Sequence, residues 1–182
     1  AFQLGLRVHN KPESQEVCFI HESSYHSFLS ERLKESIVSG PIMDQAGNVL
    51  GRHKGIPFYT VGQRRGLRLA KGKPLYVIGI DRERNAIIVG GEEEVYGDTF
   101  IADSINWISS KEMTSPFTAQ VKIRYSHPGS EAILSLKGEN EVEVKFKSPQ
   151  KAITPGQAAV FYDGETVLGG GWIKEIVRSS EL

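Results

Sequence analysis

The only cysteine of the chain, Cys18, lies in the stretch KPESQEVCFI at residues 11–20. As a thiolate, a cysteine can act as a nucleophile or carry a sulfur atom as a persulfide, if a donor and an acceptor can both reach it. Its apolar neighbours in VCFI favour a simpler interpretation, because an isolated cysteine is usually a small buried hydrophobic side chain. The local sequence alone leaves both interpretations open.

A second feature is a basic window with the composition of a nucleic-acid-binding surface. Residues 45–80 contain no Asp or Glu. The same window contains His53, Arg52, Lys54, Arg64, Arg65, Arg68, Lys71 and Lys73. Arginines could hold phosphates there, and His53, Phe58 and Tyr59 could stack on bases. A solvated basic loop without a ligand is the alternative.

Two further stretches present polar groups where predicted strands begin or end. VKIRYSHPGS ends a strand with Arg124 and Tyr125, a pair that could stack on RNA and grip it. A cross-strand contact beside a solvated arginine is the alternative. TPGQAAVFY presents Gln157 directly after a Pro-Gly turn. Glycines 169–171 lack the Lys-Ser/Thr of a phosphate loop, so a bulge or close strand packing is favoured there.

Composition narrows the class of protein. The 182 residues contain 22 Lys and Arg against 22 Asp and Glu, so net charge predicts neither a nucleic-acid nor a membrane partner. No apolar run approaches the ~18 residues of a membrane span, and the five histidines lack metal-ligand spacing. A single cysteine cannot form an internal disulfide, which favours a reducing, cytoplasmic location. The opening residues suggest a fragment of a longer protein.

Periodicity predicts one helix followed by many short strands. Residues 24–39 carry apolar side chains at helical spacing, and Gly40 with Pro41 would end that helix. Residues 40–51 and 74–91 read as hairpins. Further strands are expected at 100–107, 118–125, 132–136, 142–146, 158–162 and 166–173. Strands at this regular spacing are typical of a small all-β barrel or sandwich.

The order of the motifs resembles one known family. It is similar to the C-terminal half of the tRNA-specific 2-thiouridylases, from about residue 3 to about residue 174. The stretches that carry the resemblance are SQEVCFI, GRHKGIPFYTVGQRRGL, PLYVIGIDRERNAIIVGG, KIRYSHPG and ITPGQAAVFYDGETVLGGGWI. The resemblance implies a mainly β (α+β) fold with an N-terminal helix and linker, a small central α+β domain and a C-terminal six-stranded barrel. The expected boundaries are 1–22, 23–97 and 98–182.

The resemblance also implies a role for each candidate residue. In the family, an N-terminal domain uses ATP with Mg to adenylate the wobble uridine of tRNA, and we expect that domain to be missing here. ESQEVCFI matches the family motif DSQxxCFI with Glu13 in place of Asp, so Cys18 would carry a persulfide from a cysteine desulfurase or sulfur-relay protein. The implied tRNA contacts are Arg124, Tyr125 and Gln157.

Family resemblance and the acid-free composition together extend the expected RNA contacts to His53, Lys54, Arg64 and Arg65. No metal site and no membrane partner are expected, and the fragment alone is expected to be inactive. The alternative is a non-catalytic RNA-binding barrel in which Cys18 is inert.

Overall fold

The structure is a computed structural model, and it describes residues 5, 32–33, 37–69, 72–109, 115–138 and 140–177. Its contacts divide the chain into two units, Ala1–Val38 and Ser39–Leu182. Cys18 and most of the predicted helix at 24–39 lie outside the described residues. All the elements below belong to the second unit. None of the helices within the described ranges has the length and apolar composition to span a membrane.

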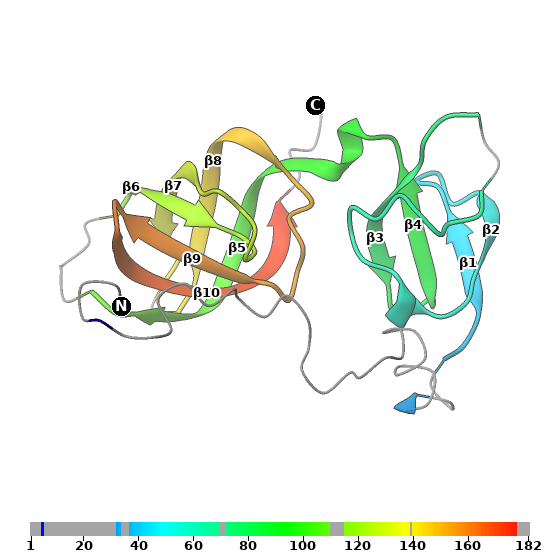
Figure 1. Ribbon diagram of the computed structural model, residues 1–182, viewed down its shortest axis with the longest axis horizontal. Helices are drawn as coiled ribbons and strands as arrows, with labels where there is room; N and C mark the ends of the chain where they lie inside the picture. Colours follow the sequence, from blue (N-terminus) through cyan, green and yellow to red (C-terminus); the bar gives the residue numbers. More distant parts are fainter. Residues whose placement is uncertain are drawn as a thin grey trace. The chain divides into compact units, whose positions relative to one another are not determined.

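The first part of this unit is a four-stranded sheet (Figure 1). Its strands are β1 (Gly40–Met43), β2 (Val49–His53), β3 (Tyr76–Asp81) and β4 (Ala86–Gly90), in the order β2-β1-β4-β3. The predicted hairpins at 40–51 and 74–91 supply its two antiparallel pairs. The Asp44 carboxylate fixes the first turn by accepting hydrogen bonds from the Asn48 N–H at 2.8 Å and from its side-chain amide at 2.9 Å.

A parallel contact joins the two hairpins, since β1 pairs with β4 at Ile42 and Ile87. Both of these side chains are fully buried, with Val77, Val89 and Leu67 completing the core of the sheet. A single-turn helix η2 (Ile56–Phe58) lies between β2 and β3, and η3 (Glu93–Val95) follows β4. No local pattern in the sequence indicates this parallel pairing, because it depends on which buried faces fit together.

The remaining strands close into a six-stranded barrel (Figure 1). They are β5 (Tyr96–Trp107), β6 (Phe117–Lys122), β7 (Ser130–Leu136), β8 (Val142–Lys151), β9 (Ala158–Asp163) and β10 (Thr166–Val177). The order around the barrel is β10-β5-β8-β7-β6-β9, and β10 pairs with both β5 and β9. The expectation of a mainly β fold with a six-stranded barrel is therefore confirmed.

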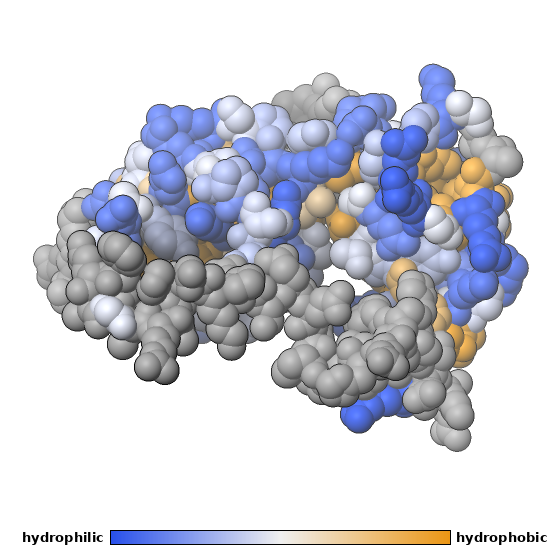
Figure 2. Space-filling view, in the orientation of Figure 1, coloured by the Kyte–Doolittle hydropathy of each residue, from blue (hydrophilic) through white to orange (hydrophobic). Residues whose placement is uncertain are grey.

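A bulge in β5 determines which of its side chains face the barrel core. Phe100 and Ala102 are buried in the core, whereas Ile105 and Trp107 pack against it further along the strand. One extra residue must reverse the alternation between these pairs. Ser104, which has a left-handed φ of 51°, supplies that residue. In Figure 2 the visible barrel surface is largely hydrophilic, as expected when one face of each strand fills a closed core.

Candidate nucleic-acid interface

A groove on the barrel surface brings three sequence-predicted residues together. Arg124 and Tyr125 follow the end of β6, and Gln157 immediately precedes β9. All three line one open cavity of about 450 Å³. We call it the first groove, and its lining is Lys122, Arg124, Tyr125, Gln157, Ala158, Val160 and Tyr162. No acidic residue is among these, so the first groove presents cations, aromatic rings and an amide.

The turn after β6 anchors one side chain and exposes the next. The guanidinium of Arg124 donates a hydrogen bond to the backbone oxygen of Lys151 at 2.9 Å through Nη1, which leaves its other donors for a ligand. The Tyr125 side chain is 78% exposed, although it is large and apolar over most of its ring. An exposed ring beside an oriented guanidinium can stack on a base while the cation binds a phosphate.

A buried histidine network supports this turn, and sequence reasoning did not assign it any role. His127 is only 4% exposed, and its backbone N–H donates to the Arg124 carbonyl at 3.0 Å. The ring Nδ1 accepts the Gly129 N–H at 3.2 Å, so Nε2 carries the proton that it shares with Gln150 Oε1 at 3.0 Å. Ser130 Oγ donates to the same Gln150 oxygen at 3.1 Å. In the sequence, the His-Pro-Gly stretch that begins at His127, shortly after Arg124 and Tyr125, was the feature that could have indicated this network.

Gln157 has a fixed backbone and a side-chain oxygen without a partner. Its N–H donates to the Thr154 carbonyl at 3.2 Å, and its carbonyl accepts the Ile173 N–H at 2.8 Å. The side-chain Oε1 is buried but makes no hydrogen bond within the described residues. Leaving a buried acceptor unpaired costs roughly 1–3 kcal/mol. A ligand that donates a hydrogen bond into the first groove would compensate for that cost.

The basic window of the small sheet is not part of this groove. Lys54, Arg64 and Arg65 are exposed, but none of them lines the first groove. His53 is 1% exposed, its Nε2 donates to the Asn85 carbonyl at 2.8 Å, and its Nδ1 accepts the Gly55 N–H at 3.0 Å. Both ring nitrogens are therefore used inside the protein. His53 holds β2 to the β3–β4 turn and is removed from the candidate RNA contacts.

The arginine pair at 64–65 lies in a loop that a glutamine side chain braces. Gln63 Oε1 accepts the Thr60 N–H at 3.0 Å, and Gln63 Nε2 donates to the Arg65 carbonyl at 2.9 Å. The Gln63 backbone carbonyl also accepts the Val77 N–H at 2.9 Å, which ties the loop to β3. The segment TVGQRRGL thus forms an ordered platform for two exposed arginines.

An ion pair links the end of β8 to the residue before η3. Lys151 Nζ lies 2.7 Å from Glu92 Oε1 and also lies over the rings of Tyr76 and Tyr96, at 5.2 and 5.6 Å from their centroids. The hydrogen bond from Lys151 lowers the pKa of Glu92, and the same bond raises the pKa of Lys151.

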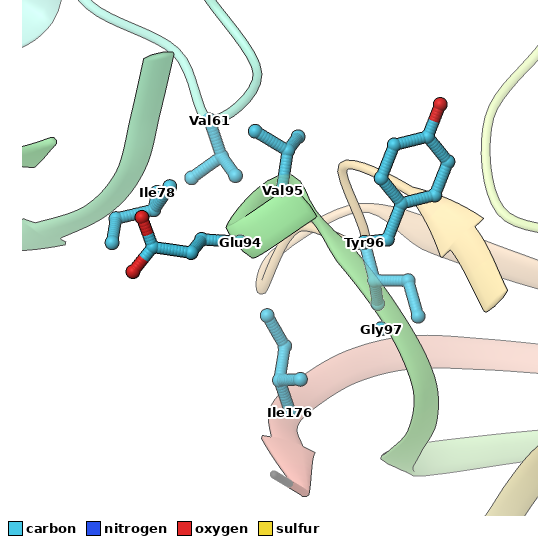
Figure 3. A pocket seen from close by; sticks show the side chains of 8 residues that line it. Val61, Ile78, Glu94, Val95, Tyr96, Gly97 and Ile176 are labelled. Atoms are coloured by element: carbon cyan, nitrogen blue, oxygen red, sulfur yellow. The ribbon is translucent and has the colours of Figure 1, made fainter. Parts of the chain in front are cut away.

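A small cavity lies close to this ion pair, around η3 and the start of β5 (Figure 3). The lining includes Val61, Ile78, Val95 and Ile176, together with Glu94. Its volume of about 10 Å³ is room for roughly one water molecule. It is therefore a small gap between packed side chains and is too small to hold a ligand.

Two family models match consecutive parts of the chain. Residues 26–91 match the tRNA methyl transferase PRC-barrel domain, and residues 97–173 match the aminomethyltransferase beta-barrel domain. The first match includes the four-stranded sheet and the second includes most of the six-stranded barrel. The chain therefore combines two domains whose family models are named after a tRNA methyl transferase and an aminomethyltransferase.

Similarity to individual curated proteins identifies the family to which the chain belongs. The chain is 51% identical to the tRNA-specific 2-thiouridylase MnmA of Halothermothrix orenii, over 96% of this chain and 49% of the relative. It is 49% identical to the protein of that name from Desulforamulus reducens (98% and 48% covered) and 50% identical to that from Heliobacterium modesticaldum (100% and 47%). The chain belongs to the tRNA-specific 2-thiouridylase family, and it spans about half the length of the curated relatives it matches.

Proposed function

We propose that the first groove binds tRNA, as part of an enzyme that converts the wobble uridine of tRNA to 2-thiouridine. The observation that carries the proposal is the convergence of Arg124, Tyr125 and Gln157 in one acid-free groove, with an unpaired buried acceptor on Gln157. The name shared by the relatives, tRNA-specific 2-thiouridylase, supports RNA rather than another anion as the ligand.

Each groove residue would use a different part of the RNA. Tyr125 would stack on an exposed base, and Arg124 and Lys122 would bind phosphates. Gln157 Oε1 would accept a hydrogen bond from a ribose 2′-hydroxyl or a base N–H, the donors that RNA offers in a loop. Lys122 Nζ lies 5.5 Å from the centroid of the Tyr162 ring, which holds the cation at the edge of the groove.

The chemical step would involve Cys18 and groups that this sequence does not contain. A cysteine desulfurase or sulfur-relay protein would transfer a sulfane sulfur to the Cys18 thiolate, forming a persulfide. The terminal sulfur would bond to C2 of the adenylated uridine, and AMP would leave. A second thiol would then cleave the S–S bond, and an external reductant would open the resulting disulfide. Because Cys18 is the only cysteine in the sequence, the second thiol must come from elsewhere.

ATP and Mg²⁺ would be bound by another domain of the whole protein. Glycines 169–171, the glycine-richest stretch of the chain, lie within strand β10 and pair with β5 and β9. A strand paired on both sides has no backbone N–H groups free to cradle a phosphate. Glycines 169–171 therefore do not form a phosphate loop, and adenylation, with the thiolation that depends on it, would require another domain of the enzyme.

The groove proposal is tested by tRNA binding across a salt series. We expect the double variant Arg124→Ala, Tyr125→Ala to lower affinity for an unmodified tRNA transcript by at least about tenfold, since a stacked ring and a phosphate contact are both lost. The slope of log K against log salt should become less steep by about one, the change expected when one phosphate contact is lost. Lys145→Ala, an exposed lysine on β8 outside the groove, is the matched control. Equal losses in the control and the double variant would sink the proposal.

The sulfur-carrier role is separated from the inert-cysteine alternative by intact mass spectrometry. After incubation with a cysteine desulfurase and cysteine, we expect a gain of one sulfur atom that is located on Cys18 and removed by a reductant. The full-length enzyme is treated in parallel. A gain only in full-length protein would mean that the loading site spans two domains. No gain in either protein would favour the non-catalytic RNA-binding alternative.

A further inference from the structure

A second groove lies directly beside the first on the outer surface of the barrel. It has a volume of about 290 Å³ and crosses strands β5, β10 and β9. Its lining is Ser104, Asn106, Ile108, Ala158, Ala159, Val160, Val167, Gly169, Gly170, Gly171 and Trp172. Ala158 and Val160 line both grooves, so the two cavities adjoin along β9. The second groove, like the first, has no acidic residue in its lining.

The strand register shows how the two grooves form one surface. Gly170 pairs with Asn106 on one side and with Val160 on the other, and Val160 pairs with Lys122. Paired residues in neighbouring strands direct their side chains to the same face of a sheet. Asn106, Gly170, Val160 and Lys122 therefore form one row across four strands, from the second groove into the first.

The centre of this row has no side chain. A Cβ added to Gly170 would lie 2.6 Å from the Ala159 carbonyl oxygen, so close packing of β10 on β9 requires glycine there. The outer surface consequently has a floor of peptide backbone, without a side chain, between Asn106 and Val160. A planar ring can approach such a floor more closely than it can approach a row of side chains.

A large aromatic side chain stands beside this floor. Trp172 lies on the same outward face as Gly170, is paired with Ala158, and is 55% exposed. The other tryptophan of the chain, Trp107, is partly buried against the barrel core, with ring centroids 6.2 Å from Phe117 and 5.7 Å from Phe161. Folding alone does not require an indole to be left in water at the rim of a groove.

We propose that the second groove receives one unstacked base of the RNA bound in the first groove, with the Trp172 indole as its stacking partner. The inference rests on the proposed tRNA binding and extends it by one nucleotide subsite. The base would lie over the glycine floor, with Asn106 and Ser104 available to hydrogen-bond its edge. The adjoining phosphate would face Lys122 at the other end of the row. The cationic groove next to it, which the row reaches at Lys122, favours RNA over an apolar protein segment.

The two tryptophans make the subsite directly observable. Trp107→Phe leaves Trp172 as the only tryptophan, and we expect its fluorescence to be quenched by an unmodified tRNA transcript with the same midpoint as binding. In Trp172→Phe the remaining Trp107 packs against the core and does not line the second groove, so the quenching should disappear although binding persists. If Trp107→Phe does not fold, fluorotryptophan ¹⁹F NMR of the otherwise unchanged chain reports the two indoles separately.

Affinity supplies the second readout. We expect Trp172→Ala to weaken tRNA binding by about fivefold to tenfold, the lower part of the range for one stacked base, and Trp172→Phe to stay within about twofold. Neither variant should change the salt slope, because no charge is removed. Ile133→Ala, an exposed apolar residue on β7, is the matched control.

The outcomes separate this inference from the function on which it rests. Binding that depends on Arg124 and Tyr125, without Trp172 quenching and with full affinity in Trp172→Ala, would overturn the subsite and leave the first groove intact. No measurable tRNA binding by the unchanged chain would overturn both. Quenching together with a loss confined to Trp172→Ala would establish the subsite.

Discussion

Gln157 separates the requirements of folding from those of binding. Its backbone groups bond to Thr154 and Ile173, but its side-chain oxygen is buried without a partner. A protein gains nothing in stability from such an atom, because the oxygen has lost water and received no donor in return. The arrangement is understandable if a ligand supplies that donor.

This asymmetry predicts opposite effects for Gln157→Leu. We expect tRNA affinity to fall by about fivefold, since one hydrogen bond to RNA is lost, whereas the free energy of unfolding should stay equal or rise by about 1 kcal/mol. Urea denaturation and a binding titration on the same samples measure both quantities. A substantial loss of stability with unchanged affinity would show that the amide serves the fold.

His127 is expected to act on RNA binding only through the turn that it supports. Replacing His127 by Ala removes the ring hydrogen bonds to Gln150 and Gly129, and we expect a loss of about 1–3 kcal/mol in the free energy of unfolding. The affinity for tRNA should fall as well, because Arg124 and Tyr125 lose their fixed position. Normal affinity in the folded variant would show that the turn does not need the histidine.

At the scale of elements, the strands were predictable because each carries its own pattern. Hairpins at 40–51 and 74–91 and the six later strands are present within a few residues of the expected bounds. Glycines 169–171 form close strand contacts, as their context predicted. The parallel β1–β4 pairing and the bulge at Ser104 were not predictable, since they follow from packing between segments distant in sequence.

The braced loop at 60–67 gives a prediction for an element. Gln63→Ala removes hydrogen bonds to the Thr60 N–H and the Arg65 carbonyl, which leaves the loop held by its backbone contacts with Val77. We expect faster amide hydrogen exchange confined to this loop, with the barrel unchanged. If Arg64 and Arg65 bind RNA, affinity should fall as the platform loosens. Unaltered exchange would mean that the backbone contacts suffice.

The Glu92–Lys151 pair gives a pH dependence with a definite sign. Since the pKa of Glu92 is lowered in the fold, its contribution is present above the unfolded pKa, at about 4.3, and is lost as pH falls through the folded value. The raised pKa of Lys151 gives a contribution that is present below about 10.4 and lost as pH rises through its folded value.

Glu92→Gln should therefore flatten the acid side of the stability profile. We expect its midpoint temperature to fall less steeply than that of the unchanged chain between about pH 5 and pH 3. Glu93→Gln, for which no ion pair to a lysine is present among the described contacts, is the control. Parallel acid limbs in all three proteins would show that the pair contributes nothing measurable, which is common for exposed ion pairs.

At the scale of the whole molecule, the sequence was most informative about barrel residues and least about histidines. Arg124, Tyr125 and Gln157 were predicted from a family motif and converge in the first groove. His53 was predicted to contact RNA, and His127 was assigned no role. Both are buried, and both ring nitrogens of each are hydrogen-bonded. Burial of a polar side chain depends on its partners, and one partner of each ring lies far along the chain, 32 residues from His53 and 23 residues from His127.

The placement of β10 between β5 and β9 has a consequence for how the protein is made. All four strands of the sheet lie before residue 91, so their pairing can be completed while the barrel is still being synthesised. The barrel has no such freedom, because its first strand, β5, keeps an open edge until β10 has left the ribosome. An unpaired edge is a template for pairing with other chains. A nascent chain whose emerged part ends just before residue 166 would therefore expose two open edges, those of β5 and β9, and aggregation during translation should be greatest at that point.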